Sequence, residues 1–580
     1  MSEQKQSTRP LRFGVFELDP QARELRRRGV RVKLQQKPFQ ILEMLLERAG
    51  EVVTRKDLRE RLWPDTFVGF DRSLNTAVNA LRRALADSPT NPRFIETRSR
   101  HGYRFIAPTD AGSAQVNTLD ADSLDSIAVL PFRNASGDPE MEYLSDGITE
   151  SLINALSQLP EIRVMARSTV FRYKAREVDP QAVGQSLNVR ALVTGTVMQR
   201  AETLTIGAEL VDATKGWRLW GERYQRKLPD IFNVQDEISR EIAQKLRLRL
   251  TAEAQRRLTK RYTANPEAFQ NYLRGRYLWN KMTEEGLRKG IVYFERAIEQ
   301  DPRFALPWAG ISDSVALFAF FGLCPSKEVM PRAEDAARKA LALDNTVADA
   351  HASLAGILKS FHWDWSGAEA EYKRALELNP SHATARRWYA NYLSALGRTE
   401  EALQEMHRAL DLDPLSLIIN MELAWIYYMG RDNGRAADLA LRTLEMEPGF
   451  SPTRHVLGLA HEQMGKFKDA IQLLQEAHAN SGGNPISLAA LAHAYARANR
   501  PQEARKTLAR LKALSGRAYV PPYAFAFVHA GLGDKSQSLI WLQKALEDRD
   551  AWLVWVQCDP RLDILREEPP FHELLRRMGF

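Results

Sequence analysis

A spacing of 34 residues recurs through the C-terminal half of the chain and limits its fold more than any other feature. Mostly small residues return at this interval in three series: Gly356, Ala390, Ala424, Gly458, Ala492 and Ala526; Ala368, Ala402, Ala436, Ala470, Ala504 and Ser538; and Ala375, Ala409, Thr443, Ala477, Leu511 and Ala545. Small side chains let two helices pack closely, so each unit is expected to be a helix pair stacked on the next. Six units in one register predict an all-α solenoid.

The repeats resemble a known family. Two looser units precede the six, and Pro380, Pro414 and Pro448 close three units. Residues 264–580 therefore resemble an array of tetratricopeptide repeats whose tail, from Asp559 onwards, is expected to form a terminal cap. The resemblance implies a groove for a protein partner or for self-association. Most aromatic residues on the repeats are expected in the core, and a minority in that groove.

Residues 72–85 have the period of one amphipathic helix. Its apolar stripe is Leu74, Val78, Leu81 and Leu85, which follow one another at helical spacing. The other face is predicted to carry polar and basic side chains: Arg72, Asn75, Thr76, Asn79, Arg82 and Arg83. Side chains of these types can pair with base edges and phosphates. This helix is therefore predicted to pack on the core through its apolar stripe and to present its polar face to DNA.

A short hairpin pattern follows this helix. Two strand-like runs, 94–97 and 103–106, flank a tight basic tip at 98–102. The candidate DNA contacts in the hairpin are Thr97, Arg98, Arg100, His101, Tyr103 and Arg104. A polar helix followed by a basic hairpin is how a winged helix-turn-helix meets double-stranded DNA. We expect Arg72, Asn75, Asn79 and Arg82 in the major groove, and Arg98, Arg100 and Arg104 in the wing.

The charge distribution supports a polyanionic partner. Residues 1–107 hold 22 Lys and Arg against 13 Asp and Glu, whereas the rest of the chain holds 59 against 60. The whole basic excess therefore lies with the helix and hairpin, which is the electrostatic footprint of a nucleic-acid-binding domain. The alternatives are a solvated basic face or a membrane-surface patch. The membrane alternative lacks an amphipathic basic helix with exposed aromatic residues.

The N-terminal pattern completes a winged helix. Short strands are predicted at 12–18, 23–26 and 30–34, and helices at 38–48 and 55–62. Thr54 is placed to cap the second of these helices.

Segment 10–107 resembles the OmpR/PhoB-type winged-helix domain of bacterial transcription regulators. The matching residues are Leu34, Phe39, the run 50–55, Leu58, Leu62-Trp63, Arg72, Leu81-Arg82, Thr97 and Gly102-Tyr103-Arg104. The resemblance implies that the third helix enters the major groove, that the wing reaches the minor groove, and that the loop between helices two and three can touch RNA polymerase. Arg98-Ser99-Arg100 replaces the family's frequent Val-Arg-Gly. No receiver domain is recognised, so aspartate phosphorylation is not the expected input.

The middle of the chain has a different pattern. Residues 1–9 are expected to be disordered, and residues 108–123, which are small, polar and acidic, form a predicted linker. Residues 124–250 alternate strands with helices, which indicates an α/β domain. The runs 130–132, 143–153 and 193–224 carry a resemblance to the TolB N-terminal-like domain. That domain accompanies tetratricopeptide arrays in cyclase-associated and CadC-like proteins. A transmembrane helix occupies the linker position in membrane-bound CadC/ToxR-like regulators, and its absence here predicts a soluble, cytoplasmic protein.

Catalytic chemistry has little support in the sequence. No nucleotide-binding, zinc-protease or serine-hydrolase motif is present, so neither an enzyme activity nor a cofactor or metal is expected. Asp138, Asp146 and Glu150 are expected to be solvated or to cap helices. Cys324 and Cys558 lack metal-type spacing.

The preferred hypothesis is a DNA-binding transcription regulator whose C-terminal half serves signal input or oligomerisation. The alternative is an interaction scaffold whose winged helix docks protein. A protein-docking wing has no need of a large basic excess, which favours the first hypothesis.

Overall fold

In the computed structural model, the described residues are 11–13, 16–19, 22–27, 30–32, 34–48, 52–63, 70–85, 87, 94–98, 102–107, 124–176, 178–200, 203–227, 231–246, 251–258 and 260–580. The chain divides into two compact units, Met1–Ala121 and Asp122–Phe580. The predicted disordered segment 1–9 and the predicted linker 108–123 lie outside the described residues, except that Asp122 marks the start of the second unit.

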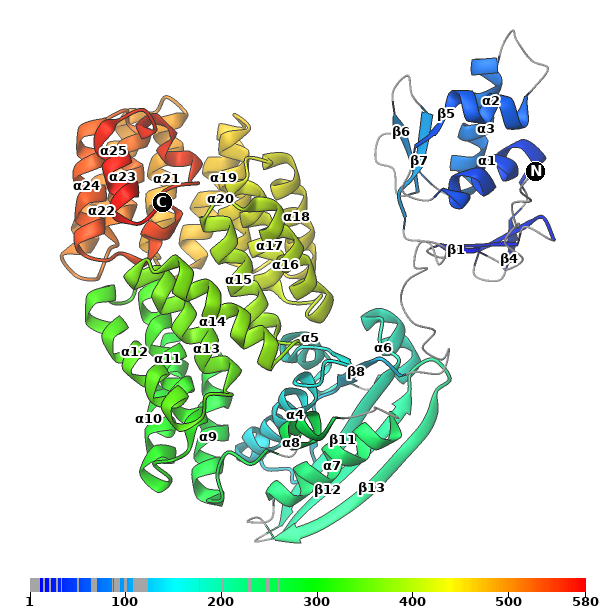
Figure 1. The fold of residues 1–580 in the computed structure, drawn as a ribbon. Helices are drawn as coiled ribbons and strands as arrows, with labels where there is room; N and C mark the ends of the chain where they lie inside the picture. Colours follow the sequence, from blue (N-terminus) through cyan, green and yellow to red (C-terminus); the bar gives the residue numbers. More distant parts are fainter. Residues whose placement is uncertain are drawn as a thin grey trace. The chain divides into compact units, whose positions relative to one another are not determined.

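The described residues of the first unit form two small sheets and three helices (Figure 1). Its elements are β1 (Leu11–Phe13), β2 (Phe16–Asp19), β3 (Glu24–Arg27), β4 (Val30–Val32), α1 (Gln36–Glu47), β5 (Val52–Thr54), α2 (Arg55–Leu62), α3 (Phe70–Leu85), β6 (Ile95–Arg98) and β7 (Gly102–Phe105). Strands β1 to β4 form an antiparallel meander, and β7 lies between β5 and β6. The single strand predicted at 12–18 is wrong, because β1 and β2 pair with each other as a hairpin.

Both predicted signals around α2 and α3 are confirmed. Thr54 caps α2: its hydroxyl accepts from the Asp57 N–H at 3.1 Å, while the Asp57 carboxylate accepts from the Thr54 N–H at 3.1 Å. Hydrogen bonds from the backbone and the side chain of Thr54 to the Asp57 carboxylate hold the pKa of Asp57 below its usual value. The apolar stripe of α3, from Leu74 to Leu85, is fully buried in the core of the unit.

The second unit begins with an α/β region (Figure 1). Its strands are β8 (Ser126–Val129), β9 (Arg133–Asn134), β10 (Arg163–Val164), β11 (Ala191–Arg200), β12 (Thr203–Asp212) and β13 (Trp217–Lys227). The sheet order is β10-β8-β11-β12-β13, with β9 also paired to β11. Strands β8 and β10 run parallel to their neighbours, and β11 to β13 form an antiparallel meander.

Helices of this region are η1 (Pro139–Met141), α4 (Glu142–Ser157), α5 (Arg167–Val170), η2 (Phe171–Tyr173), α6 (Pro180–Leu187), α7 (Ile231–Lys245) and α8 (Ala252–Leu258). Helices α4 and α7 contact each other and pack on the sheet. Helix α7 ends at Lys245, and the separate helix α8 follows it.

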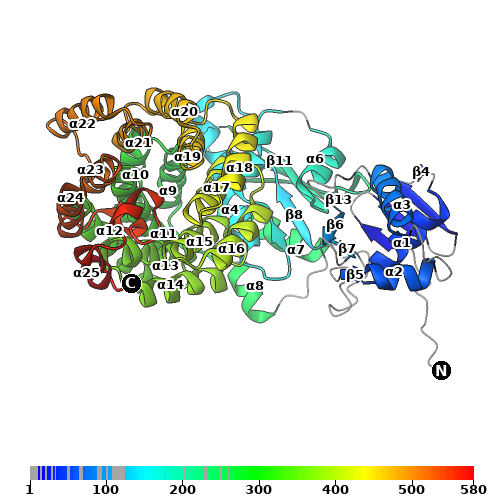
Figure 2. The same cartoon turned by 90° about the horizontal axis from the view of Figure 1, so that it is seen from above.

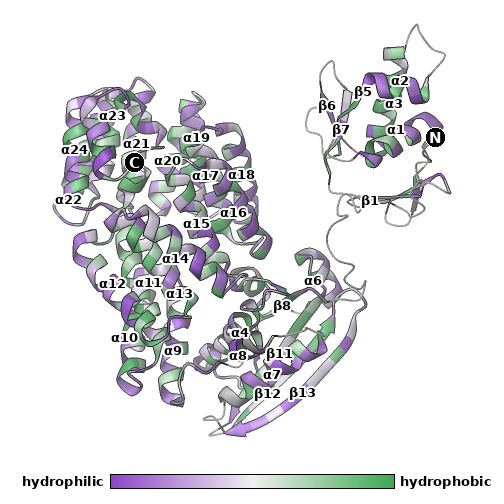
Figure 3. Cartoon of the chain, viewed as in Figure 1, coloured by the Kyte–Doolittle hydropathy of each residue, from purple (hydrophilic) through white to green (hydrophobic). Residues whose placement is uncertain are grey.

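Eight helix pairs form the repeat array (Figure 2). They are α9 (Pro266–Trp279) with α10 (Glu284–Gln300), α11 (Ala305–Phe320) with α12 (Ser326–Leu343), α13 (Ala348–Ile357) with α14 (Trp365–Leu378), α15 (Ala383–Ala395) with α16 (Thr399–Leu412), α17 (Leu417–Met429) with α18 (Asn433–Met446), α19 (Ser451–Gln463) with α20 (Phe467–Asn480), α21 (Pro485–Arg497) with α22 (Pro501–Ser515), and α23 (Pro522–Gly531) with α24 (Lys535–Glu547). The repeat array contains both hydrophobic and hydrophilic helical segments (Figure 3). A π-helical turn, η4 (Leu358–His362), separates α13 from α14.

The α/β region packs directly on the turns of the repeats. The Ala166 N–H donates to the Leu412 carbonyl at 2.8 Å, and the Leu415 N–H donates to the Thr169 hydroxyl at 2.9 Å. Arg163 also donates to the Asp411 carbonyl at 3.0 Å. These bonds join a short segment after β10 to the turn between α16 and α17, so the two regions form one body.

A buried ionic cluster joins α4 to the first repeat. The Glu150 carboxylate accepts from Arg276 at 2.8 Å and from the Asn280 amide at 2.9 Å, and Arg167 lies 3.0 Å away. Burial alone would raise the pKa of Glu150, but Arg276 and Arg167 hold it below its usual value. Asp146 lies in the same cluster and pairs with Lys174 at 2.6 Å. The expectation of solvated or capping roles is therefore wrong for Asp146 and Glu150.

The expectation of a capping role holds for Asp138. Its side chain accepts from the Glu140 N–H at the start of η1 at 2.9 Å.

The C-terminal tail returns to the third repeat. After α24 come η5 (Ala551–Trp555), η6 (Pro560–Leu565) and α25 (Pro569–Arg577). The Trp365 indole N–H donates to the Met578 carbonyl at 2.7 Å, and the Trp365 ring packs against Phe580 in a tilted geometry with centroids 4.7 Å apart. Figure 2 shows the C-terminus beside α13 and α14. The tail therefore closes the array onto itself in addition to covering its last helix.

Candidate nucleic-acid interface

The outer face of α3 carries three of the predicted contacts. Thr76, Asn79 and Arg83 are exposed, on the side opposite the buried stripe. The Asn79 side-chain amide makes no hydrogen bond with any residue that the structure describes, and its backbone carbonyl accepts weakly from Arg83 Nε at 3.4 Å. An exposed amide of this kind is free to pair with a base edge. Arg72 begins the same face, but its side chain lies outside the described part of the structure.

Arg82 does not face outward, and this prediction is wrong. Its side chain is only 6% exposed and donates to the Ile95 carbonyl at 2.8 Å and to the Thr97 hydroxyl at 2.7 Å. Position 82 follows Val78 by four residues, so it sits on the flank of the buried stripe and turns toward β6. The guanidinium therefore joins α3 to the hairpin.

Asn75 makes a second link between α3 and the hairpin. It is exposed, but its side-chain oxygen accepts from the Tyr103 hydroxyl at 2.9 Å. Tyr103 is itself buried at 3% exposure, so its ring belongs to the core and only its hydroxyl reaches α3. Asn75 and Arg82 thus hold the helix and the wing in a fixed relation, which pre-organises the surface between them.

Arg55 belongs to this surface and was not among the predicted residues. Its guanidinium lies 5.7 Å from the Tyr103 ring centroid and 3.5 Å from the Asn75 side-chain oxygen. It is the first residue of α2, directly after the capping Thr54. A basic residue next to a helix N-terminus is a common phosphate contact. The position of Arg55 directly after the predicted capping residue is the signal in the sequence that could have identified it.

The wing presents fewer described cations than predicted. Arg104 pairs with Glu96 across β7 and β6 at 2.7 Å, so its charge is neutralised within the hairpin. Thr97 is exposed, and its hydroxyl accepts from Arg82. Arg100 and His101 lie outside the described residues, as does the Arg98 side chain.

Gly102 lies where β7 of the hairpin approaches the backbone of β5 closely. A Cβ atom at this position would lie 2.1 Å from the Val53 carbonyl oxygen and 2.9 Å from the Thr54 Cα. Only glycine lets β7 pair with β5 at this distance. The wing base is therefore packed against the strand that leads into α2.

Two features are absent from the described residues: a membrane-spanning helix and a cluster of metal ligands. No helix among them combines the length and apolar character needed to cross a bilayer. Within the same residues, no three His, Cys, Asp or Glu side chains are grouped so that they could hold a metal ion.

Family models match along most of the chain. Residues 29–105 match the C-terminal domain of transcriptional regulatory proteins. Residues 122–241 match the second domain of HilA/YgeH-like transcriptional regulators, which describes the α/β region more specifically than the TolB-like resemblance. Residues 364–449 and 462–517 match tetratricopeptide repeats. None of these families describes a catalytic domain.

Individual relatives are similar to different parts of the chain. Transcriptional regulator HilA of Salmonella typhimurium is 25% identical over 72% of this chain and 73% of its own length. A Rhizobium meliloti protein that carries the name adenylate cyclase 3 is 38% identical over 40% of this chain, which covers only 39% of that relative. The solved Klebsiella pneumoniae RstA DNA-binding domain, crystallised with the RstA box, is 34% identical over 17% of this chain and 96% of its own, with a TM-score of 0.16.

The winged helix, the α/β region and the repeats together define a class, the DNA-binding transcriptional regulators that carry a tetratricopeptide array. Within that class, the chain is similar to HilA-like regulators in its second domain.

Proposed function

We propose that the first unit binds double-stranded DNA with α3 in the major groove. Thr76, Asn79 and Arg83 read bases or contact phosphates, with Arg72 at the start of the helix. The observation that supports this proposal most is the exposed Asn79 amide, because Asn75 and Arg82 hold its helix against the hairpin. Arg98, Arg100 and His101 serve the wing, and Arg55 contacts a phosphate beside it.

The contribution of Asn79 is tested on a binding site selected from random DNA. A side-chain amide pairs with the N6 and N7 atoms of adenine. Asn79→Ala is therefore expected to cost about 1–3 kcal/mol on the selected site and to relax preference at one base pair. Lys468→Ala on the repeats is the control. Equal losses on selected and random DNA would contradict base reading by Asn79.

We further propose that the second unit sets the oligomeric state. A winged-helix monomer reads few base pairs, so useful occupancy needs two protomers on adjacent half-sites. Tethering raises the local concentration of the second DNA-binding unit into about the millimolar range. The full chain is therefore expected to bind a two-site operator more tightly than isolated residues 1–121, with the same bases protected. Equal affinities would contradict a role in avidity.

We also propose a location and partners for the protein. The protein acts in the cytoplasm by binding rather than by catalysis, and the repeat groove takes a protein partner or a second copy. Contact with RNA polymerase through the loop between α2 and α3 would make it an activator. Crosslinking from position 66 to purified polymerase tests that contact, and promoter-bound chain that gives no crosslink would contradict it.

A further inference from the structure

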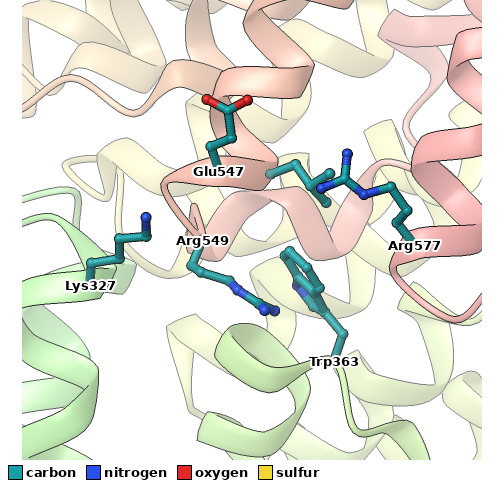
Figure 4. Close-up of a pocket in the computed structure, with 6 residues that line it drawn as sticks. Lys327, Trp363, Glu547, Arg549 and Arg577 are labelled. Carbon is teal, nitrogen blue, oxygen red and sulfur yellow. The ribbon is translucent and has the colours of Figure 1, made fainter.

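A pocket of about 560 Å³ lies where the C-terminal tail closes on the array (Figure 4). It is lined by Lys327, Trp363, Leu546, Glu547, Arg549 and Arg577. These residues come from the second and third repeats and from the C-terminal end, so the pocket exists only in the closed array. Its volume lies in the range of about 300–1,000 Å³ that is usual for small-molecule sites.

Three cations surround this pocket without an acidic partner. Arg549 donates to the Phe361 carbonyl at 3.1 Å, and Arg577 donates to the Gln543 side-chain oxygen at 3.2 Å. Neither they nor Lys327 form an ion pair with any residue in the described part of the chain. Figure 4 shows Lys327, Arg549 and Arg577 around one open space.

The acidic residue of the pocket does not balance these charges. The Glu547 carboxylate accepts from Gln543 Nε2 at 2.9 Å, along its own helix. The pocket therefore keeps an excess of two positive charges. Lys327 is the second residue of α12, whose N-terminus has no side-chain cap and carries Glu328 in its first turn.

The Arg549 guanidinium is held in place by packing. It lies 4.0 Å from the Trp363 ring centroid, and both residues have a positive φ, of 55° and 59°. Burial, together with the charge of Arg577, lowers the pKa of Arg549. Burial and a nearby like charge both destabilise the charged form of such a fixed guanidinium. A bound anion therefore stabilises it more than it would stabilise a solvated cation.

We propose that this pocket binds a small multivalent anion, carrying phosphate or carboxylate groups, that ties the C-terminal end of the array to its second and third repeats. Such a ligand favours the closed array because only that state brings the three cations together. The site goes beyond the DNA-binding function proposed above, and its occupancy does not depend on that function.

The test measures binding of pyrophosphate and of citrate to the full chain by isothermal titration calorimetry, without DNA. At least one anion is expected to bind saturably and to raise the melting temperature. Arg577→Gln and Lys327→Gln should each weaken that binding roughly tenfold or more, since each removes a charge-assisted hydrogen bond. The identity of the tighter anion separates phosphate from carboxylate chemistry.

Lys468→Gln is the matched control, because Lys468 is also an exposed lysine at the second position of a repeat helix, α20. It is expected to leave the affinity unchanged. The melting temperatures of all three variants without anion report whether the fold is intact. The proposal is overturned if neither anion binds saturably, or if Lys468→Gln weakens binding as much as the two pocket variants.

Discussion

Replacing Arg82 by Ala separates a structural arginine from a DNA-binding one within a single helical turn. The substitution removes hydrogen bonds to the Ile95 carbonyl and the Thr97 hydroxyl, at 2.8 and 2.7 Å. Thr97 is exposed and regains water, whereas Ile95 is fully buried and its carbonyl loses its guanidinium partner. Arg83, the next residue, is exposed and serves as the matched control.

The magnitude follows from these two contacts. A hydrogen bond to a charged group contributes about 1.5–3 kcal/mol, and an unsatisfied buried carbonyl costs a comparable amount. Removing the buried charge recovers part of this, so Arg82→Ala is expected to cost about 2–4 kcal/mol. In a domain of about 100 residues, that loss lowers the melting temperature by roughly 10–20 °C. Arg83→Ala should leave the stability within about 0.5 kcal/mol of the original.

Two assays on residues 1–121 check the separation. Thermal unfolding gives stability, and DNA affinity at several salt concentrations gives the number of phosphate contacts. Arg83→Ala is expected to lessen the slope of log K against log salt by about 0.9, and Arg82→Ala to leave it unchanged below its melting temperature. The reasoning is refuted if Arg82→Ala keeps the original stability and flattens the salt dependence, because the guanidinium would then contact DNA.

Three further substitutions test other contacts. Gly102→Ala should cost about 2–3 kcal/mol, because its Cβ would lie 2.1 Å from the Val53 carbonyl oxygen; an unchanged melting temperature of the first unit would contradict this. Burial raises the pKa of Asp313 to about 7. Between about pH 4 and 7 the folded chain therefore keeps a proton that the unfolded chain has released. The free energy of unfolding then falls as pH rises, by at most about 1.4 kcal/mol per pH unit. Asp313→Asn should remove that decline in denaturant titrations across this range, and a persisting decline would assign it to other groups. Glu150→Gln leaves Arg276 buried without its counter-charge and should cost about 3–5 kcal/mol of the second unit's stability in chemical denaturation; a loss below about 1 kcal/mol would contradict the cluster's role.

Periodic signals were readable from the sequence because each depends on local geometry. The α3 stripe from Leu74 to Leu85, the Thr54 cap and the 34-residue register all gave the elements that the structure contains. The exposed face with Thr76, Asn79 and Arg83 also followed from that stripe.

Tertiary contacts were not readable in the same way. A helical period distinguishes the buried face of a helix from its exposed face but does not decide the positions between them. The sequence pattern therefore assigned Arg82 to the exposed face, whereas its side chain is buried. Strand β5 is only three residues long, and its pairing with β7 depends on the close approach at Gly102. Glu150 finds Arg276 more than a hundred positions later, in another fold region, and no local pattern records that pairing.

The return of the tail to Trp365 changes how the array can come apart. An open solenoid behaves as a one-dimensional stack, in which terminal repeats fray first and unfolding spreads inward one unit at a time. Here the last helix is bonded to the third repeat through Trp365 and Met578, so the C-terminal repeats have no free end from which to fray. Opening that junction is a separate first event, and the five repeats it encloses, from α15 to α24, are expected to lose protection against hydrogen exchange together.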